Sequence, residues 1–150
     1  MSFFGALDVS ATALTAQRFR MDLISQNIAN AQTTRTSEGG AYRRKLAVFK
    51  EITDFDSALS DALGSISTSG TSTPGYGVRV AEIATDTQGG TRVYDPGHPD
   101  ADLDGYVVMP NVNIVEEMVD MISASRSYEA GVTVINSTKS MIARTMELGR

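Results

Sequence analysis

The chain has 150 residues, the length of a single domain, and its 13 basic and 18 acidic side chains give a net charge of −5 at pH 7. This acidic balance argues against nucleic acid or an anionic membrane surface as the main partner. Cysteine is absent, which excludes disulfide frameworks and thiolate zinc sites.

The first predicted element is a long helix between about residues 3 and 33. Apolar residues recur at steps of three and four, at Leu7, Ala11, Leu14, Met21, Ile24 and Ile28. That spacing is helical, and no proline precedes residue 74. The helix ends in SQNIANAQTT, where Asn27 and Asn30 lie one turn apart beside Ile28. A fraying helix end and a polar contact that sets the register of an interface explain these amides equally well.

The middle of the chain, about residues 40–110, is predicted to be rich in β-structure. Runs of β-branched and aromatic residues between turn signals predict strands at residues 42–52, 78–85, 91–94 and 106–109. Residues 53–63 have apolar side chains at helical spacing, which predicts a short helix. Residues 64–77 are almost entirely Gly, Ser, Thr and Pro, which predicts an exposed, flexible loop.

The C-terminal segment, from Ile114 to Leu148, carries the strongest helix signal. Ten positions alternate steps of four and three: Ile114, Met118, Met121, Ser125, Tyr128, Val132, Ile135, Lys139, Ile142 and Met146. All of them except Ser125 and Lys139 are apolar or aromatic. This heptad spacing is typical of helices that pack lengthwise on one another. Pro110 ends the preceding segment, and Asn113 with Glu116 has the spacing of a capping box.

These elements predict an α+β fold in which the long N- and C-terminal helices pair as a coiled-coil-like domain, with a small β-rich insert between them. The helical domain is discontinuous, formed by residues 1–38 and 111–150, and the β-rich domain spans residues 39–110. Both helices also carry a second apolar stripe, formed by Phe3, Phe4, Phe19 and Leu23 in the first and by Val115, Val119 and Ile122 in the second. Because two paired helices bury only one face each, we expect the second faces to bind other subunits.

No residue pattern in the sequence points to catalysis or to a cofactor. The single histidine, His98, lies between two proline-containing turns, and the glycine pairs lack the spacing of a phosphate-binding loop. Arg43, Arg44 and Lys45 are consecutive in a predicted strand, so alternate side chains point to opposite faces and do not form one nucleic-acid-binding patch. We therefore expect a non-enzymatic protein without a cofactor.

One acidic segment has two interpretations. Asp100, Asp102 and Asp104, followed by Gly105, match the opening of a calcium-binding loop. The twelfth position of such a loop supplies a bidentate glutamate, but here it is Asn111. The favoured interpretation is an acidic turn in which the aspartates bond to their own backbone.

Two segments resemble one protein family. LTAQRFRMDLISQNIANAQTTRTSEGGAYRRK, residues 14–45, is similar to the N-terminal signature of bacterial flagellar basal-body rod proteins. VYDPGHPDADLDGYVVMPNVNIVEEMVDMISASRSYEAGVTVINSTKSM, residues 93–141, resembles the C-terminal half of the proximal rod members of that family. Ala41 and Gly131 depart from the family pattern, in which proline and asparagine are common at these positions. The glycine weakens the helix locally by up to ~1 kcal/mol relative to alanine.

The resemblance implies a structural subunit of the flagellar proximal rod, a drive shaft that helps to transmit torque from the motor to the hook and filament. The partners it implies are other copies of the chain, other flagellar rod proteins and, at the proximal end, the MS ring and the export gate. It also implies an extracytoplasmic, periplasmic location in the basal body. The alternative is a soluble coiled-coil adaptor or a secreted effector that binds a single partner.

The resemblance further implies export through the flagellar type III apparatus without a cleaved signal. The first residues, MSFFGALDVSATAL, lack the basic start and the continuous apolar centre of a Sec signal, which agrees with that expectation. No run of apolar residues is long enough to span a bilayer, so we expect no direct membrane insertion.

In this family the terminal helices pack as a coiled-coil-like inner tube with a β-rich domain outside it. The resemblance therefore favours an interface role for the asparagine-rich segment over a fraying helix end. The residues expected in the assembly interface are Leu14, Met21, Asn27, Ile28, Asn30, Ile114, Met118, Met121, Tyr128, Val132, Ile135, Ile142 and Met146.

Overall fold

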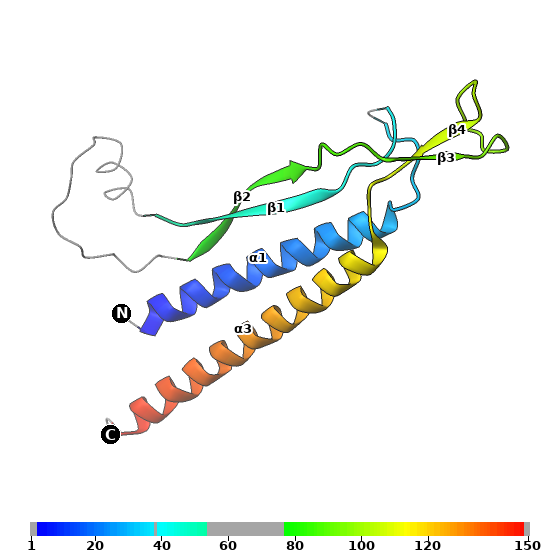
Figure 1. Ribbon diagram of the computed structural model, residues 1–150. Coiled ribbons are helices and arrows are strands. Elements are labelled where there is room, and N and C mark those ends of the chain that lie inside the picture. The colour runs from blue at the N-terminus through cyan, green and yellow to red at the C-terminus, as the bar shows by residue number, and fades with distance from the viewer. Residues whose placement is uncertain (1–2, 38, 54–76, 149–150) are drawn as a thin grey trace, which may run out of the picture.

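The computed structural model describes residues 3–37, 39–53 and 77–148. Its elements are α1 (Phe3–Ala29), β1 (Lys45–Glu51), β2 (Val78–Thr85), β3 (Thr91–Tyr94), β4 (Tyr106–Met109) and α3 (Ile114–Leu148). In Figure 1, α1 and α3 lie side by side, with the start of α1 and the end of α3 at the same end of the pair. The predicted α+β class and the pairing of the terminal helices are confirmed. The predicted short helix at 53–63 and the predicted loop at 64–77 lie almost wholly outside the described residues.

The β-strands form two separate antiparallel pairs. β1 pairs with β2 from Lys45↔Thr85 to Glu51↔Val78, and the register shifts between Val48 and Phe49. β3 pairs with β4, from Thr91↔Met109 to Tyr94↔Tyr106. Figure 1 shows that the β1–β2 hairpin runs along α1, whereas the β3–β4 ribbon lies beyond the ends of the helices.

Three predicted strands match the structure, but the first begins at Lys45 rather than at residue 42. The preceding residues are held by the helices and the loop after α1. The Tyr42 N–H donates to the carbonyl of Thr33, and the side chain of Arg44 bonds to Glu117 of α3. Sequence periodicity carries no signal for these contacts, because they join residues far apart in the chain.

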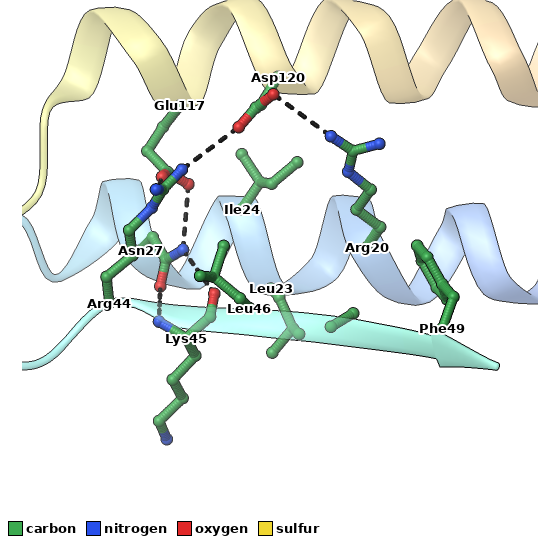
Figure 2. Close-up of a pocket in the computed structure, with 11 residues that line it drawn as sticks. Arg20, Leu23, Ile24, Asn27, Arg44, Lys45, Leu46, Phe49, Glu117 and Asp120 are labelled. Carbon is green, nitrogen blue, oxygen red and sulfur yellow. Dashed lines mark hydrogen bonds and ion pairs between the residues drawn. The ribbon is translucent and has the colours of Figure 1, made fainter. Parts of the chain in front are cut away.

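α1 is buried on two faces. The first faces α3 and includes Leu14, which contacts Gly131, and Ile24, which Figure 2 shows pointing towards α3. The second faces the β1–β2 hairpin and includes the buried side chains of Ala16 and Leu23. Of the second apolar stripe of this helix, Leu23 is therefore covered within the chain, whereas Phe19 is only half-buried beside the hairpin. Nothing is described for the side chains of Phe3 and Phe4, which belong to the same predicted stripe.

α3 packs on α1 through a seam that differs from the predicted one at every second position. Met121, Tyr128, Ile135 and Ile142 are half-buried, in agreement with the prediction. At the alternate positions, Glu117, Ala124, Gly131 and Thr138 face α1, whereas Met118, Val132 and Lys139 are exposed and Ser125 is half-buried. Ala124 is 0% exposed, whereas Met118 is 54% exposed. The prediction was wrong at Met118, Val132 and Lys139, because small residues allow the helix backbones to approach and these larger side chains lie outside the seam.

Gly131 shows how close this approach is, because a Cβ atom placed on it would lie 2.8 Å from Cδ2 of Leu14. We predict that Gly131→Leu lowers the free energy of unfolding by roughly 1–3 kcal/mol, the usual cost of overpacking a core. Gly131→Ala should change it less, since the gain in helix propensity offsets a small shift of Leu14. Thermal unfolding followed by circular dichroism at the helix band measures both effects.

A double-mutant cycle provides the control for this prediction. Leu14→Ala removes the side chain that Gly131→Leu displaces, so the two changes together should cost less than the sum of their separate costs. Strict additivity would contradict the contact between these two positions.

Candidate functional site

The side chain of Asn27 joins three elements of the fold. It is 1% exposed, and its Nδ2 donates to the carbonyl of Lys45 at 2.9 Å and to Oε2 of Glu117 at 3.0 Å. Its Oδ1 accepts from the Lys45 N–H and from the Tyr42 hydroxyl, each at 3.0 Å. Figure 2 shows this amide between α1, the start of β1 and α3. Both donors and both lone pairs of the amide are therefore used within the chain.

Glu117 begins a row of alternating charges between the helices. Its carboxylate is 1% exposed and accepts a hydrogen bond from Nε of Arg44. Arg44 Nη2 also lies 3.3 Å from Asp120, and Arg20 Nη2 lies 3.3 Å from the other oxygen of Asp120. The two positive charges of the arginines are thus matched by the two negative charges of the carboxylates, so the buried charge of Glu117 is paired. Figure 2 shows the row linking α3 with α1 and the residue before β1.

The three consecutive basic residues diverge around this row. Arg43 is exposed, Arg44 bonds to the two acidic residues of α3, and the Lys45 ammonium lies 5.9 Å from the ring centroid of Tyr42. The sequence predicted that these residues would not form one basic patch, and in the structure they do not. The reason is not strand alternation, however, because Arg43 and Arg44 precede β1.

Tyr42 is buried beside the amide of Asn27 and donates its hydroxyl hydrogen to it. Burial raises the pKa of this hydroxyl above its usual value of 10.0, and the negative charge of Glu117 raises it further. Tyr42 therefore remains a neutral donor throughout the physiological range.

Asn30 has a different role, because it closes the end of α1. Its Nδ2 donates to the carbonyl of Gln26 at 2.9 Å, and its Oδ1 accepts from the hydroxyl of Thr33 at 3.2 Å. The Thr33 N–H also donates to the Asn30 carbonyl. These are the contacts of a helix terminus, so the two asparagines of SQNIANAQTT serve different purposes.

Asp100 and Asp102, from the segment that matches the opening of a calcium loop, have separate partners. Asp100 accepts from the Thr34 hydroxyl at 2.8 Å and lies 3.6 Å from Arg35, whereas Asp102 lies 3.7 Å from Arg92. Gly105 has a φ of +78°, and its N–H donates to the carbonyl of Asp102 in the turn before β4. Within the described ranges, no three His, Asp or Glu side chains lie where they could hold a metal ion together. The contacts are those of a turn that ties the β3–β4 ribbon to the loop after α1.

The outward face of α3 is apolar over its first turns. Val115 is 69% exposed and Val119 is 61% exposed, and Met118 and Ile122 beside them are more than half exposed. These four residues, which we call the α3 ridge, follow steps of three and four and therefore share one side of the helix. Ala124 and Gly131 of the seam lie on the opposite side. The second apolar stripe of α3 is thus exposed, whereas Leu23 of the α1 stripe is buried.

The residues predicted for the assembly interface fall into three groups. Those half-buried in the helix pair are Leu14, Met21, Ile28, Met121, Tyr128, Ile135 and Ile142. Those exposed on α3 are Ile114, Met118, Val132 and Met146. Asn27 and Asn30 make the contacts within the chain described above. The residues of the polar cluster that the sequence did not predict are Arg20, Tyr42, Arg44, Glu117 and Asp120. The one signal that could have found them is Glu117, an acidic residue at seven-residue spacing from the small residues Ala124 and Gly131.

Comparison with known proteins identifies the family. Residues 7–35 match the family model described as "Flagella basal body rod protein", and residues 103–148 match "Flagellar basal body rod FlgEFG protein C-terminal". The chain is 47% identical to the flagellar basal-body rod protein FlgC of Borreliella burgdorferi, over 99% of this chain and 98% of that one. The chain belongs to the FlgC family of flagellar basal-body rod proteins. The FlgC proteins of Bacillus subtilis and Salmonella typhimurium are 44% and 39% identical to it, each over the full length of both chains.

Family membership makes the chain a structural component of the flagellar basal-body rod and not an enzyme. None of the helices in the described residues has the length and apolar character needed to cross a membrane.

The hydrogen bonds of Asn27 lead to a stability prediction. Asn27→Asp keeps the shape of the side chain but turns a carboxylate oxygen towards Glu117 and the Lys45 carbonyl, which are both acceptors. We predict a loss of roughly 3 kcal/mol or more in the free energy of unfolding, measured by urea titration, because an uncompensated charge is buried. The matched change Asn30→Asp should cost less than about 1 kcal/mol, the scale of a helix-terminus effect. Equal losses for the two variants would contradict the role assigned to Asn27.

The raised pKa of Tyr42 leads to a pH prediction. Unfolded Tyr42 ionises near its usual pKa of 10.0, whereas folded Tyr42 ionises at a higher pH. The stability that this group contributes is therefore fully present below pH 10 and is lost as the pH rises through the folded pKa. Unfolding free energies measured across this alkaline range should fall more steeply for the native chain than for Tyr42→Phe. Parallel curves would show that Tyr42 titrates alike in both states.

Proposed function

We propose that the chain is a self-assembling subunit of the proximal rod and that it joins its neighbours through the outward face of α3. The observation that carries this proposal is the α3 ridge, an apolar surface on a helix whose other side is already packed. Monomeric soluble proteins rarely leave large contiguous apolar surface in water, and such surface usually marks a protein interface. Family membership supports the same conclusion, because a rod is built from subunits in contact.

The proposal divides the predicted interface residues by role. Ile114, Met118, Val132 and Met146 are exposed and are the ones we assign to contacts with neighbouring subunits. The half-buried residues of the helix pair act indirectly, because they hold α3 in the position from which its outer face is presented. Asn27 is fully buried and also acts indirectly, because all hydrogen-bonding groups of its amide are used within the chain.

The partners we propose are other copies of the chain and other flagellar rod proteins, with the MS ring and the export gate at the proximal end. The helix pair would form the inner, assembling domain, and the β-rich part would lie outside it. A periplasmic location, export by the flagellar type III apparatus and a share in transmitting torque are parts of the same proposal. A single-partner adaptor is less favoured, because the relatives that match the whole chain are rod proteins.

Substitutions on the ridge test the proposal. Val119→Asp and Ile122→Asp place a carboxylate where we expect an apolar contact, and burying an unpaired charge costs several kcal/mol. We predict that either variant folds, since both positions are exposed, but is absent from purified basal bodies and leaves cells non-motile. Circular dichroism of the purified chain and immunoblots of basal bodies measure the two effects.

The matched control is Thr133→Asp, which places the same charge at an exposed polar position further along the same side of α3. It should be incorporated and support swimming. Wild-type amounts of Val119→Asp in complete rods would show that the ridge is not an assembly contact.

A further inference from the structure

A second apolar surface lies on the opposite part of the molecule, between α1 and the β1–β2 hairpin. It is a groove of about 500 Å³, lined by Ala11, Thr15 and Phe19 of α1 and by Ile52, Val78 and Val80 of the hairpin. Ala11 and Thr15 are exposed at its edge, as is Arg79 of β2. The groove is thus concave and apolar, with a cationic residue at its rim.

The groove and the ridge have complementary features. The four apolar side chains of the α3 ridge project from one side of one helix, and Val115 and Val119 also border a hollow beside Arg44. Glu116 is exposed beside it, next in sequence to Val115. Neither Glu116 nor Arg79 forms an ion pair with any described residue. An acidic side chain at the edge of the ridge can therefore meet a basic one at the rim of the groove, which favours this pairing and its orientation.

We propose that the α3 ridge of one copy packs into the α1–hairpin groove of a second copy. This proposal rests on the proposed function and specifies which surfaces meet. The contact is heterologous, since it joins two different surfaces of the same chain. Each copy then supplies a ridge to one neighbour and a groove to the next, and repetition of such a contact generates a ring or a helical filament. A shaft built from repeated subunits needs a contact of that kind.

The size of the contact explains why it forms only in the assembly. Stable interfaces bury about 1,200–2,000 Å² in total, contributed by some 20–30 residues a side. A ridge of four apolar residues in one groove is much smaller than that. Isolated copies should accordingly stay monomeric at low concentration, and the contact should be sought in assembled basal bodies, where other contacts support it.

Cysteine cross-linking in basal bodies tests the pairing directly, because the native chain has no cysteine. Cells lacking the native copy would produce Val119→Cys and Thr15→Cys chains together, and purified basal bodies would then be oxidised. A disulfide requires the two Cα atoms to lie within about 7 Å. We expect a dimer on non-reducing gels in which mass spectrometry finds the residue 119 peptide joined to the residue 15 peptide. Thr133→Cys with Thr15→Cys is the matched control and should give no such dimer.

A charge exchange provides a second, independent measurement. Arg79→Glu and Glu116→Arg, each alone, should reduce incorporation into basal bodies by leaving like charges opposed across the contact. The double variant restores opposite charges and should recover most of the incorporation. Equal incorporation of single and double variants would overturn the pairing.

The outcomes separate this proposal from the proposed function. A dimer in Val119→Cys alone would mean that two ridges pack on each other, which overturns the pairing but leaves α3 as an assembly surface. Absence of the 119–15 dimer, with Val119→Asp still excluded from rods, would overturn the pairing and leave a different rod protein as the partner of the ridge. Normal incorporation of Val119→Asp without any cross-link would overturn both proposals.

Discussion

The rest of the fold depends on the buried amide of Asn27. Removing an amide from water is unfavourable unless its hydrogen bonds are replaced, and here four groups of three residues, Tyr42, Lys45 and Glu117, replace them. The bonds are satisfied together only when α1, the start of β1 and α3 are in one register. An apolar seam with a seven-residue repeat tolerates a shift by one heptad, but such a shift would leave Asn27 and Glu117 buried without partners. The amide therefore selects one alignment among several that the apolar contacts would allow.

The charged row extends this selection along the helix pair. Arg44 bonds to both acidic residues of α3, so the backbone just before β1 is held against the helices at the point where the hairpin begins. Arg20 of α1 pairs with Asp120 and so extends the charged row towards the start of α1. At the other end of the pair the contacts are apolar and close, as Leu14 against Gly131 shows. The polar cluster defines the register, and the contact of Leu14 with Gly131 adds close packing.

The sequence predicted the parts of this fold that depend on local periodicity, and failed where distant residues decide. The two helices and the strands at 78–85, 91–94 and 106–109 follow from spacing and turn residues alone. The α3 seam was wrong at alternate positions because α3 has apolar side chains on opposite sides, and larger side chains were taken as the buried ones. Packing against α1 requires small residues instead, at Ala124 and Gly131. The cluster around Asn27 could not be predicted, since Glu117 is separated from it by 90 residues and periodicity reports only local neighbours.

The two sides of α3 differ in a way that suits a subunit which folds first and assembles afterwards. The inward side uses small residues and a polar cluster in which the amide of Asn27 is saturated, so it selects one arrangement of the helices within the chain. The outward side carries Val115, Met118, Val119 and Ile122, of which methionine in particular adapts its shape to different partners. In the proposed assembly this face contacts copies of the same chain and rod proteins of different sequence, so an adaptable outer face is an advantage. The rigidity that such a shaft needs then comes from within each subunit, where Asn27 and the charged row keep α3 fixed relative to α1 and the hairpin.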